Sequence, residues 1–136
     1  MSKLIGARYF NKPRLWWGLG LLLVLTVCVL SLIHLPQMPL ALPKLSDKWQ
    51  HVLAYFAMMG WFSQLIVRKR TLVKAALCFF AMGVALEFLQ GLTGYRSLDY
   101  VDVLANSTGI LLGVGLAFTP LALVLSWVDR CLFGVV

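Results

Sequence analysis

Polar side chains recur at helical spacing in three separate apolar segments of this 136-residue chain. Spacings of three and four residues place side chains on one face of a helix. The three sets are Lys48, His51 and Tyr55; Glu87 and Gln90; and Asp99, Asp102 and Asn106, whose face continues to Gly109. An ionisable group at mid-depth in a bilayer costs about 2.5–3.5 kcal/mol. The three faces are therefore expected to meet in one pocket that opens outward.

The residue types in this predicted pocket suit proton transfer. We expect His51, Glu87 and Asp102 to be the catalytic residues, with His51 acting as base or acid and Glu87 assisting it. The other predicted site residues bind or orient a ligand: Lys48, Gln90, Arg96, Asp99 and Asn106. With Asp47 included and His51 neutral, the cluster has a net charge of −2. Crowded carboxylates resist simultaneous ionisation, so we expect a retained proton, a protonated His51 or a bound cation.

Several known kinds of site have no counterpart in the sequence. The chain contains no Gly-x-Ser-x-Gly nucleophile elbow, no His-Glu-x-x-His zinc helix and no phosphate-binding loop. Its cysteines, Cys28, Cys78 and Cys131, are odd in number and widely spaced, which argues against a disulfide framework and a zinc site. A metal held by His51, Glu87 and Asp102 is conceivable but not favoured, so we expect no metal and no cofactor.

The composition determines which elements position these residues. The chain is 61% hydrophobic and 12% charged, with a mean hydropathy of +0.88, which excludes a soluble globular domain. A span takes ~20 residues, so four spans account for most of the chain. We predict an all-α, four-helix transmembrane bundle with spans at 15–35, 48–67, 72–92 and 99–119. Residues 1–14 form a basic N-terminus, 15–128 the transmembrane domain and 129–136 a C-terminal tail.

The basic residues predict the topology. The formal charge is +7, but no soluble basic face exists, so we expect no nucleic-acid partner. Nine of the twelve Lys and Arg residues fall in the N-terminus, the 68–74 loop and the C-terminal tail. By the positive-inside rule, both termini are cytoplasmic. The acids, except Asp129, then fall at the outward ends of the helices.

Simpler structural roles compete with the site at several positions. Asp47 is favoured as an N-cap, and Asp99 with Asp102 fits a capping-box-like pair at a helix start. Lys48 could equally extend to the membrane interface. A stripe of small residues at intervals of four predicts close packing within the bundle rather than a homodimer seam. The stripe consists of Ala105, Gly109, Gly113 and Ala117.

Three of these motifs together resemble the VanZ-like membrane proteins. The matching segments are Asp47-Lys48-Trp49-Gln50-His51, Glu87-Phe88-Leu89-Gln90 and Arg96-Ser97-Leu98-Asp99-Tyr100-Val101-Asp102, continuing to Asn106 and Gly109. The resemblance covers residues ~44–115 and is specific as a combination, whereas the first span carries no matching motif. It implies an envelope role in the bacterial cytoplasmic membrane, associated with resistance to the glycopeptide teicoplanin, without assigning a reaction.

Three functions remain open at this point. The first is a protein that binds or acts on an envelope lipid or lipid-linked precursor, with a polyprenyl phosphate as the candidate partner. Lys48 and Arg96 would then engage the phosphate. The second is a non-enzymatic membrane factor that binds an antibiotic or an envelope enzyme. The third is a polar network that only stabilises the bundle. The sequence leaves the oligomeric state unknown.

Overall fold

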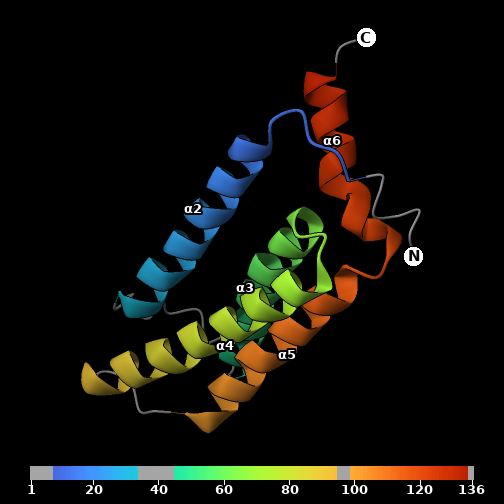
Figure 1. The fold of residues 1–136 in the computed structure, drawn as a ribbon. Helices are drawn as coiled ribbons and strands as arrows, with labels where there is room; N and C mark the ends of the chain where they lie inside the picture. Colours follow the sequence, from blue (N-terminus) through green and yellow to red (C-terminus); the bar gives the residue numbers. More distant parts are fainter. Residues whose placement is uncertain (1–7, 34–44, 95–98, 135–136) are drawn as a thin grey trace.

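The computed structural model describes residues 8–33, 45–94 and 99–134, with the side chains of 45–47 left out. Every regular element in these ranges is helical, which confirms the predicted all-α class (Figure 1). The elements are α2 (Pro13–Leu32), α3 (Leu45–Leu65), α4 (Lys69–Leu92), α5 (Tyr100–Leu116), the 3₁₀ turn η1 (Pro120–Leu123) and α6 (Val124–Phe133). The four predicted spans correspond to α2–α5, with ends shifted by up to three residues.

The ends of the helices follow from local sequence. Pro13 occupies the first turn of α2, where its missing N–H is not needed. Helix α4 is followed by Gly94, whose φ of +71° is a conformation that glycine adopts readily. Asp99 is the N-cap of α5 and accepts a hydrogen bond from the Val101 N–H at 2.8 Å. Helix α6 runs through residues 129–133, which the sequence placed in the tail.

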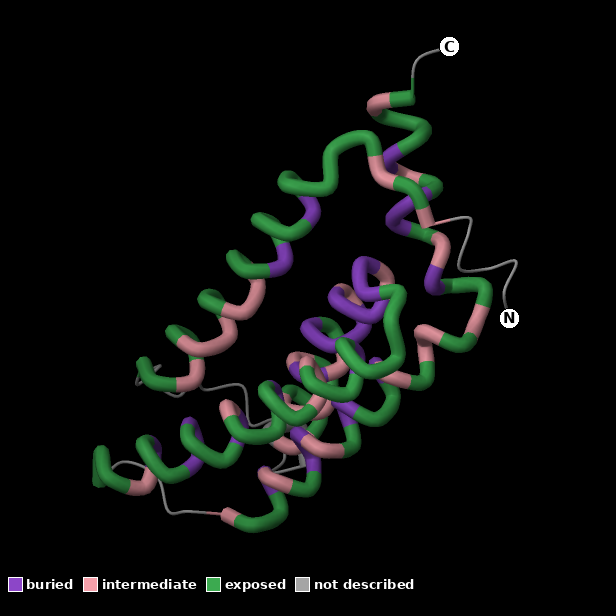
Figure 2. Tube along the Cα trace, viewed as in Figure 1, coloured by how far each residue is buried: buried purple, intermediate pink, exposed green. Residues whose placement is uncertain are grey.

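Two helices, α2 and α4, are long and apolar enough to cross a membrane. A third span results if α5 is counted together with residues 120–133, although the pair is bent by 76°. Helix α3 does not meet this test. It packs most extensively against α5, and buried positions line the facing sides of the helices (Figure 2). A helix enclosed by others needs less apolar surface toward lipid. Four spans therefore stay a prediction.

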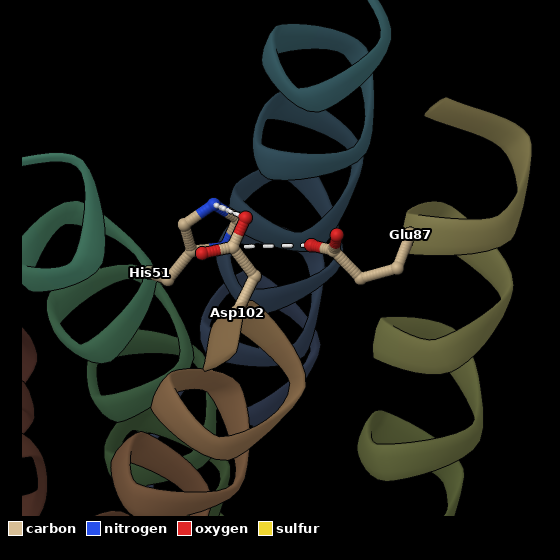
Figure 3. Close-up of side chains that lie close together, drawn as sticks. All are labelled: His51, Glu87 and Asp102. Carbon is tan, nitrogen blue, oxygen red and sulfur yellow. Dashed lines mark ion pairs between the residues drawn. The ribbon is translucent and has the colours of Figure 1, made fainter. Parts of the chain in front are cut away.

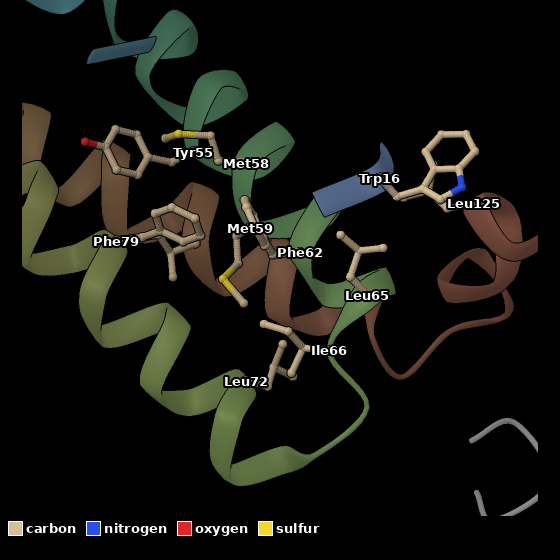
Figure 4. Close-up of a cluster of buried hydrophobic side chains, with 11 residues drawn as sticks. Trp16, Tyr55, Met58, Met59, Phe62, Leu65, Ile66, Leu72, Phe79 and Leu125 are labelled. Carbon is tan, nitrogen blue, oxygen red and sulfur yellow. The ribbon is translucent and has the colours of Figure 1, made fainter. Parts of the chain in front are cut away.

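The small-residue stripe on α5 is the reason that α3 and α5 lie so close. A Cβ at Gly109 would lie 2.4 Å from the carbonyl oxygen of Val52, and one at Gly113 would lie 2.6 Å from Cβ of Met59. Both neighbours belong to α3, so the stripe packs within the chain, as predicted. Buried apolar side chains from α3 and α4, including Met58, continue this contact (Figure 4).

Gly109→Ala is expected to destabilise the protein by about 1–3 kcal/mol, because the added methyl group meets backbone atoms of α3 that cannot move independently. Gly115→Ala is the matched control on the same helix, since nothing lies within 4 Å of its Cβ position. It should leave stability unchanged or raise it slightly. Thermal unfolding in detergent compares the two, and equal midpoints would contradict the close packing.

Two ionic groups, a partly buried arginine and a buried aspartate, link the helices at the basic end of the bundle. Arg8 donates to the carbonyl oxygens of Ser63, Ile66 and Ala117 at 2.8–3.1 Å, near the C-terminal ends of α3 and α5. A cation at helix C-termini also interacts favourably with their dipoles. Asp129 on α6 is fully buried. It accepts hydrogen bonds from the backbone N–H groups of Asn11 and Lys12 and from the Trp16 indole.

Asp129→Asn is expected to destabilise the protein by about 1.5–3 kcal/mol at neutral pH, the size of a hydrogen bond to a charged group. Burial alone would raise the pKa of Asp129, but the hydrogen bonds from Asn11, Trp16 and Lys12 outweigh it and hold the pKa below the ordinary 3.8.

The stability from this shift is complete above the ordinary aspartate pKa and is lost as the pH falls through the lowered value. Thermal midpoints measured from neutral pH into this acid range check both expectations. The wild-type midpoint should fall more steeply in acid than that of Asp129→Asn. Identical profiles for the two proteins would refute the role given to the Asp129 carboxylate.

Candidate functional site

Side chains from three helices meet at the end of the bundle opposite Arg8 and Asp129. His51 comes from α3, Glu87 from α4 and Asp102 from α5, and Figure 3 shows them pointing toward one another. His51 Nδ1 lies 3.8 Å from Glu87 Oε1, and His51 Nε2 lies 3.7 Å from Asp102 Oδ2. Glu87 is 3% exposed, Asp102 1% and His51 12%. The structure thus brings together the three residues predicted to be catalytic.

Asn106 fixes the orientation of the His51 ring. Its Oδ1 lies 2.9 Å from His51 Nδ1, and Asn106 itself is buried. Because an amide oxygen only accepts, Nδ1 is the nitrogen that donates in this arrangement. Nε2 then carries the lone pair in the neutral ring and faces the Asp102 carboxylate. This tautomer places the proton-accepting nitrogen of His51 beside an acid.

Lys48 closes the cluster toward the helix ends. Its ammonium pairs with both Asp99 and Asp102 and is 26% exposed. Asp102 is thereby bound through Oδ1 by Lys48 and faces His51 through Oδ2. Asp99 both caps α5 and pairs with Lys48, so its capping and cluster roles coexist. Lys48 therefore forms specific ion pairs with two carboxylates and does not only extend toward the membrane interface.

Tyr55 forms the inner limit of this group of polar side chains. It lies one helical turn from His51, is 2% exposed, and its hydroxyl has no hydrogen-bond partner among the described residues. A Cβ at Gly83 would lie 3.1 Å from the Tyr55 hydroxyl and 3.3 Å from Asn106 Nδ2. Gly83 therefore leaves room for two polar groups one turn below Glu87.

One of the predicted ligand-binding residues, Gln90, makes its described hydrogen bond away from His51, Glu87 and Asp102, and a second one, Arg96, is not described. Gln90 is buried, and its Nε2 donates to the carbonyl oxygen of Ser31 on α2 at 2.6 Å. This hydrogen bond links α4 to α2. Arg96 lies outside the described residues, as do the side chain of the predicted N-cap Asp47 and His34, for which the sequence predicts a position at the membrane interface.

Two polar residues have roles that the sequence interpretation did not assign. The sequence marks Asp129 only as the single acid among the inner basic residues. That unusual position is the one sequence signal for its hydrogen bonds to Asn11 and Trp16. Tyr55 shares the face of Lys48 and His51, but its burial and its lack of a described partner became visible only in three dimensions. A hollow lined by Asn11–Leu15 also lies near Asp129, at the end of the bundle opposite His51, Glu87 and Asp102.

The polar cluster, defined here as Lys48, His51, Glu87, Asp99, Asp102 and Asn106, can move a proton between groups held by different helices. An imidazole nitrogen faces one buried carboxylate, and a second carboxylate lies on the opposite side of the ring. Low dielectric strengthens each interaction within such a group. Buried acid–base groups from separate helices that face one another make this cluster the candidate functional site.

The chain was compared with known families, curated proteins and solved structures. A family model described as VanZ/LLP1 matches residues 19–125, which includes the whole polar cluster and most of the chain. No curated protein and no solved structure matches.

Proposed function

Because the chain belongs to the VanZ/LLP1 family, we propose that it is a four-pass protein of the bacterial cytoplasmic membrane that binds or acts on an envelope lipid or lipid-linked precursor. Its apolar helices support a membrane protein. The observation that carries the proposal is the meeting of His51, Glu87 and Asp102, from three helices, at one end of the bundle. An influence on glycopeptide resistance, teicoplanin in particular, belongs to this proposal through the family resemblance.

The distribution of charge supports an outward-facing site. Arg8, Arg68 and Lys69 belong to the opposite end, where α3 finishes and α4 begins. With that basic end in the cytoplasm, as the positive-inside rule favours, the polar cluster lies near the exterior headgroups. Both termini are then cytoplasmic. A head group at that depth reaches the cluster without carrying its own charge into the bilayer centre.

Each member of the polar cluster has a role in this proposal. His51 acts as the proton acceptor and donor through Nε2, and Asn106 holds the ring in the required orientation. Asp102 stabilises the imidazolium when the ring is protonated, and Glu87 assists from the other side. Lys48 and Arg96 engage the phosphate of a polyprenyl-phosphate-type lipid.

Mass spectrometry of co-purifying lipids tests the proposal. Wild-type protein, Glu87→Ala and Phe88→Ala are purified from bacterial membranes under the same mild detergent. Phe88 is the neighbouring residue on α4 and is 57% exposed, so its replacement controls for general changes at this helix. A phosphate-bearing envelope lipid should accompany wild type and Phe88→Ala and be lost from Glu87→Ala. The same lipid profile in all three folded proteins would overturn the proposal.

A further inference from the structure

The charges of the polar cluster do not balance. Among its described residues, Lys48 is the one fixed cation, whereas Glu87, Asp99 and Asp102 are carboxylates. With all three ionised and His51 neutral, these groups carry a net charge of −2. A phosphate head group is repelled by such a cluster in a low-dielectric environment. Arg96, which the proposed function assigns to the phosphate, changes this charge only to −1, so a phosphate ligand at this site still calls for additional positive charge.

The environment of His51 matches that of a metal ligand. Histidines that bind metals usually donate the other ring N–H to a carbonyl or carboxylate oxygen, which fixes the tautomer. Here Nδ1 donates to Asn106 Oδ1 at 2.9 Å, and the lone pair of Nε2 is directed toward Asp102. The ring is thus already held in the state that a metal ion needs.

The two carboxylates lie at suitable distances from this ring. Asp102 Oδ2 is 3.7 Å from Nε2, and Lys48 occupies the other oxygen, Oδ1. One ligand atom from each of His51, Glu87 and Asp102 lies within 4.8 Å of the others. Two atoms on opposite sides of one ion at about 2.0–2.2 Å are about 4.0–4.4 Å apart, so the separations are close to those of a shared ion. Glu87 Oε1 now lies 3.8 Å from Nδ1, so its carboxylate has to turn toward Nε2 to complete the set.

A second, independent observation also indicates a bound species. The Tyr55 hydroxyl is nearly inaccessible and has no hydrogen-bond partner among the described residues. It lies next to Gly83, one helical turn before Glu87. Leaving a buried hydroxyl unsatisfied costs about 1–3 kcal/mol. A water molecule bound to an ion between Glu87 and His51 would satisfy this hydroxyl, with the Asn106 amide nearby.

We propose that His51 Nε2, Glu87 and Asp102 bind a divalent cation that bridges the protein to the phosphate of its lipid. Imidazole and carboxylate ligands together suit Mn²⁺ or Zn²⁺, with the remaining positions taken by water and phosphate oxygens. The cation site rests on the geometry of three side chains, and its bridging role rests on the proposed function. This reverses the expectation from the sequence, which favoured no metal. With the cation bound, His51 Nε2 is a ligand and carries no proton, so the cation replaces the acid–base role proposed for this nitrogen.

Electron paramagnetic resonance with Mn²⁺ tests the site without any assay of activity. The full chain in nanodiscs of neutral phosphatidylcholine should bind one Mn²⁺, with a ¹⁴N coupling from His51. His51→Gln should abolish the nitrogen coupling. Glu87→Gln should lower the affinity for Mn²⁺ at least 10-fold, because loss of even a residue that only hydrogen-bonds to a metal ligand typically costs about 10–100-fold. Asp129→Asn, a buried carboxylate at the other end, should leave Mn²⁺ affinity unchanged and controls for folding.

Adding a short-chain polyprenyl phosphate separates the two proposals. Tighter binding of this lipid with Mn²⁺ than with a chelator, in wild type but not in Glu87→Gln, supports both. Stoichiometric Mn²⁺ binding without lipid binding supports the cation site and counts against the lipid function. Lipid binding that a chelator does not change, with no stoichiometric Mn²⁺, overturns the cation site and leaves the lipid function standing. Mn²⁺ binding that persists in His51→Gln without loss of coupling also overturns it.

Discussion

Replacing His51 with Gln is expected to lower turnover of the envelope lipid by about 10²–10⁴-fold, the usual contribution of a general acid–base group. Glutamine retains hydrogen bonding toward Asn106 but has no nitrogen that can accept a proton near neutral pH. Lipid binding should fall much less than turnover, because the remaining members of the polar cluster are unchanged. The measurement is mass spectrometry of lipid conversion by purified protein, with co-purified lipid measured in parallel.

His34→Gln is the control for this prediction, since His34 is the other histidine in the chain and has no charged residue three or four positions away in the sequence. It should keep full turnover. Full turnover by His51→Gln would show that the protein works without proton transfer at this ring. Such a result would favour a non-enzymatic membrane factor that binds an antibiotic or an envelope enzyme.

Asp102→Leu is expected to destabilise the protein by about 3 kcal/mol and to abolish its function. Asp102 is 1% exposed and compensates Lys48, so its loss removes the buried one of the two carboxylates that pair with this ammonium. Removing one partner of a buried ion pair typically costs 3–5 kcal/mol. We expect the lower end because Lys48 is 26% exposed and still contacts Asp99. Chemical unfolding in detergent measures the change.

The double variant Lys48→Met with Asp102→Leu separates structure from function. Replacing both members of an ion pair by apolar side chains is often neutral or stabilising, so most of the lost stability should return. Lipid turnover should stay absent, because the carboxylate that faces His51 Nε2 is still missing. If the double variant is active, the polar cluster serves only to stabilise the bundle. If stability fails to return, the ion pair is not what Asp102→Leu removed.

The sequence by itself determined the fold class and most of the side chains that come together in the polar cluster. Apolar composition and helical periodicity depend on local residue types, so they predicted an all-helical chain with ends close to those of α2–α5. The cost of burying charge among apolar residues singled out His51, Glu87 and Asp102. The small residues on α5 indicated a close helix contact for the same reason, since only a missing side chain lets backbones approach.

The tertiary structure alone decided which partners each polar group has. Helical spacing gives the face of a side chain but not the rotation or depth of the neighbouring helix. Gln90 shares a face with Glu87, yet its amide reaches Ser31 of α2. Asp129 is far in sequence from Asn11 and Trp16, which it binds. Such contacts form only when separate helices pack together. The same packing places the His51 ring between the carboxylates of Glu87 and Asp102.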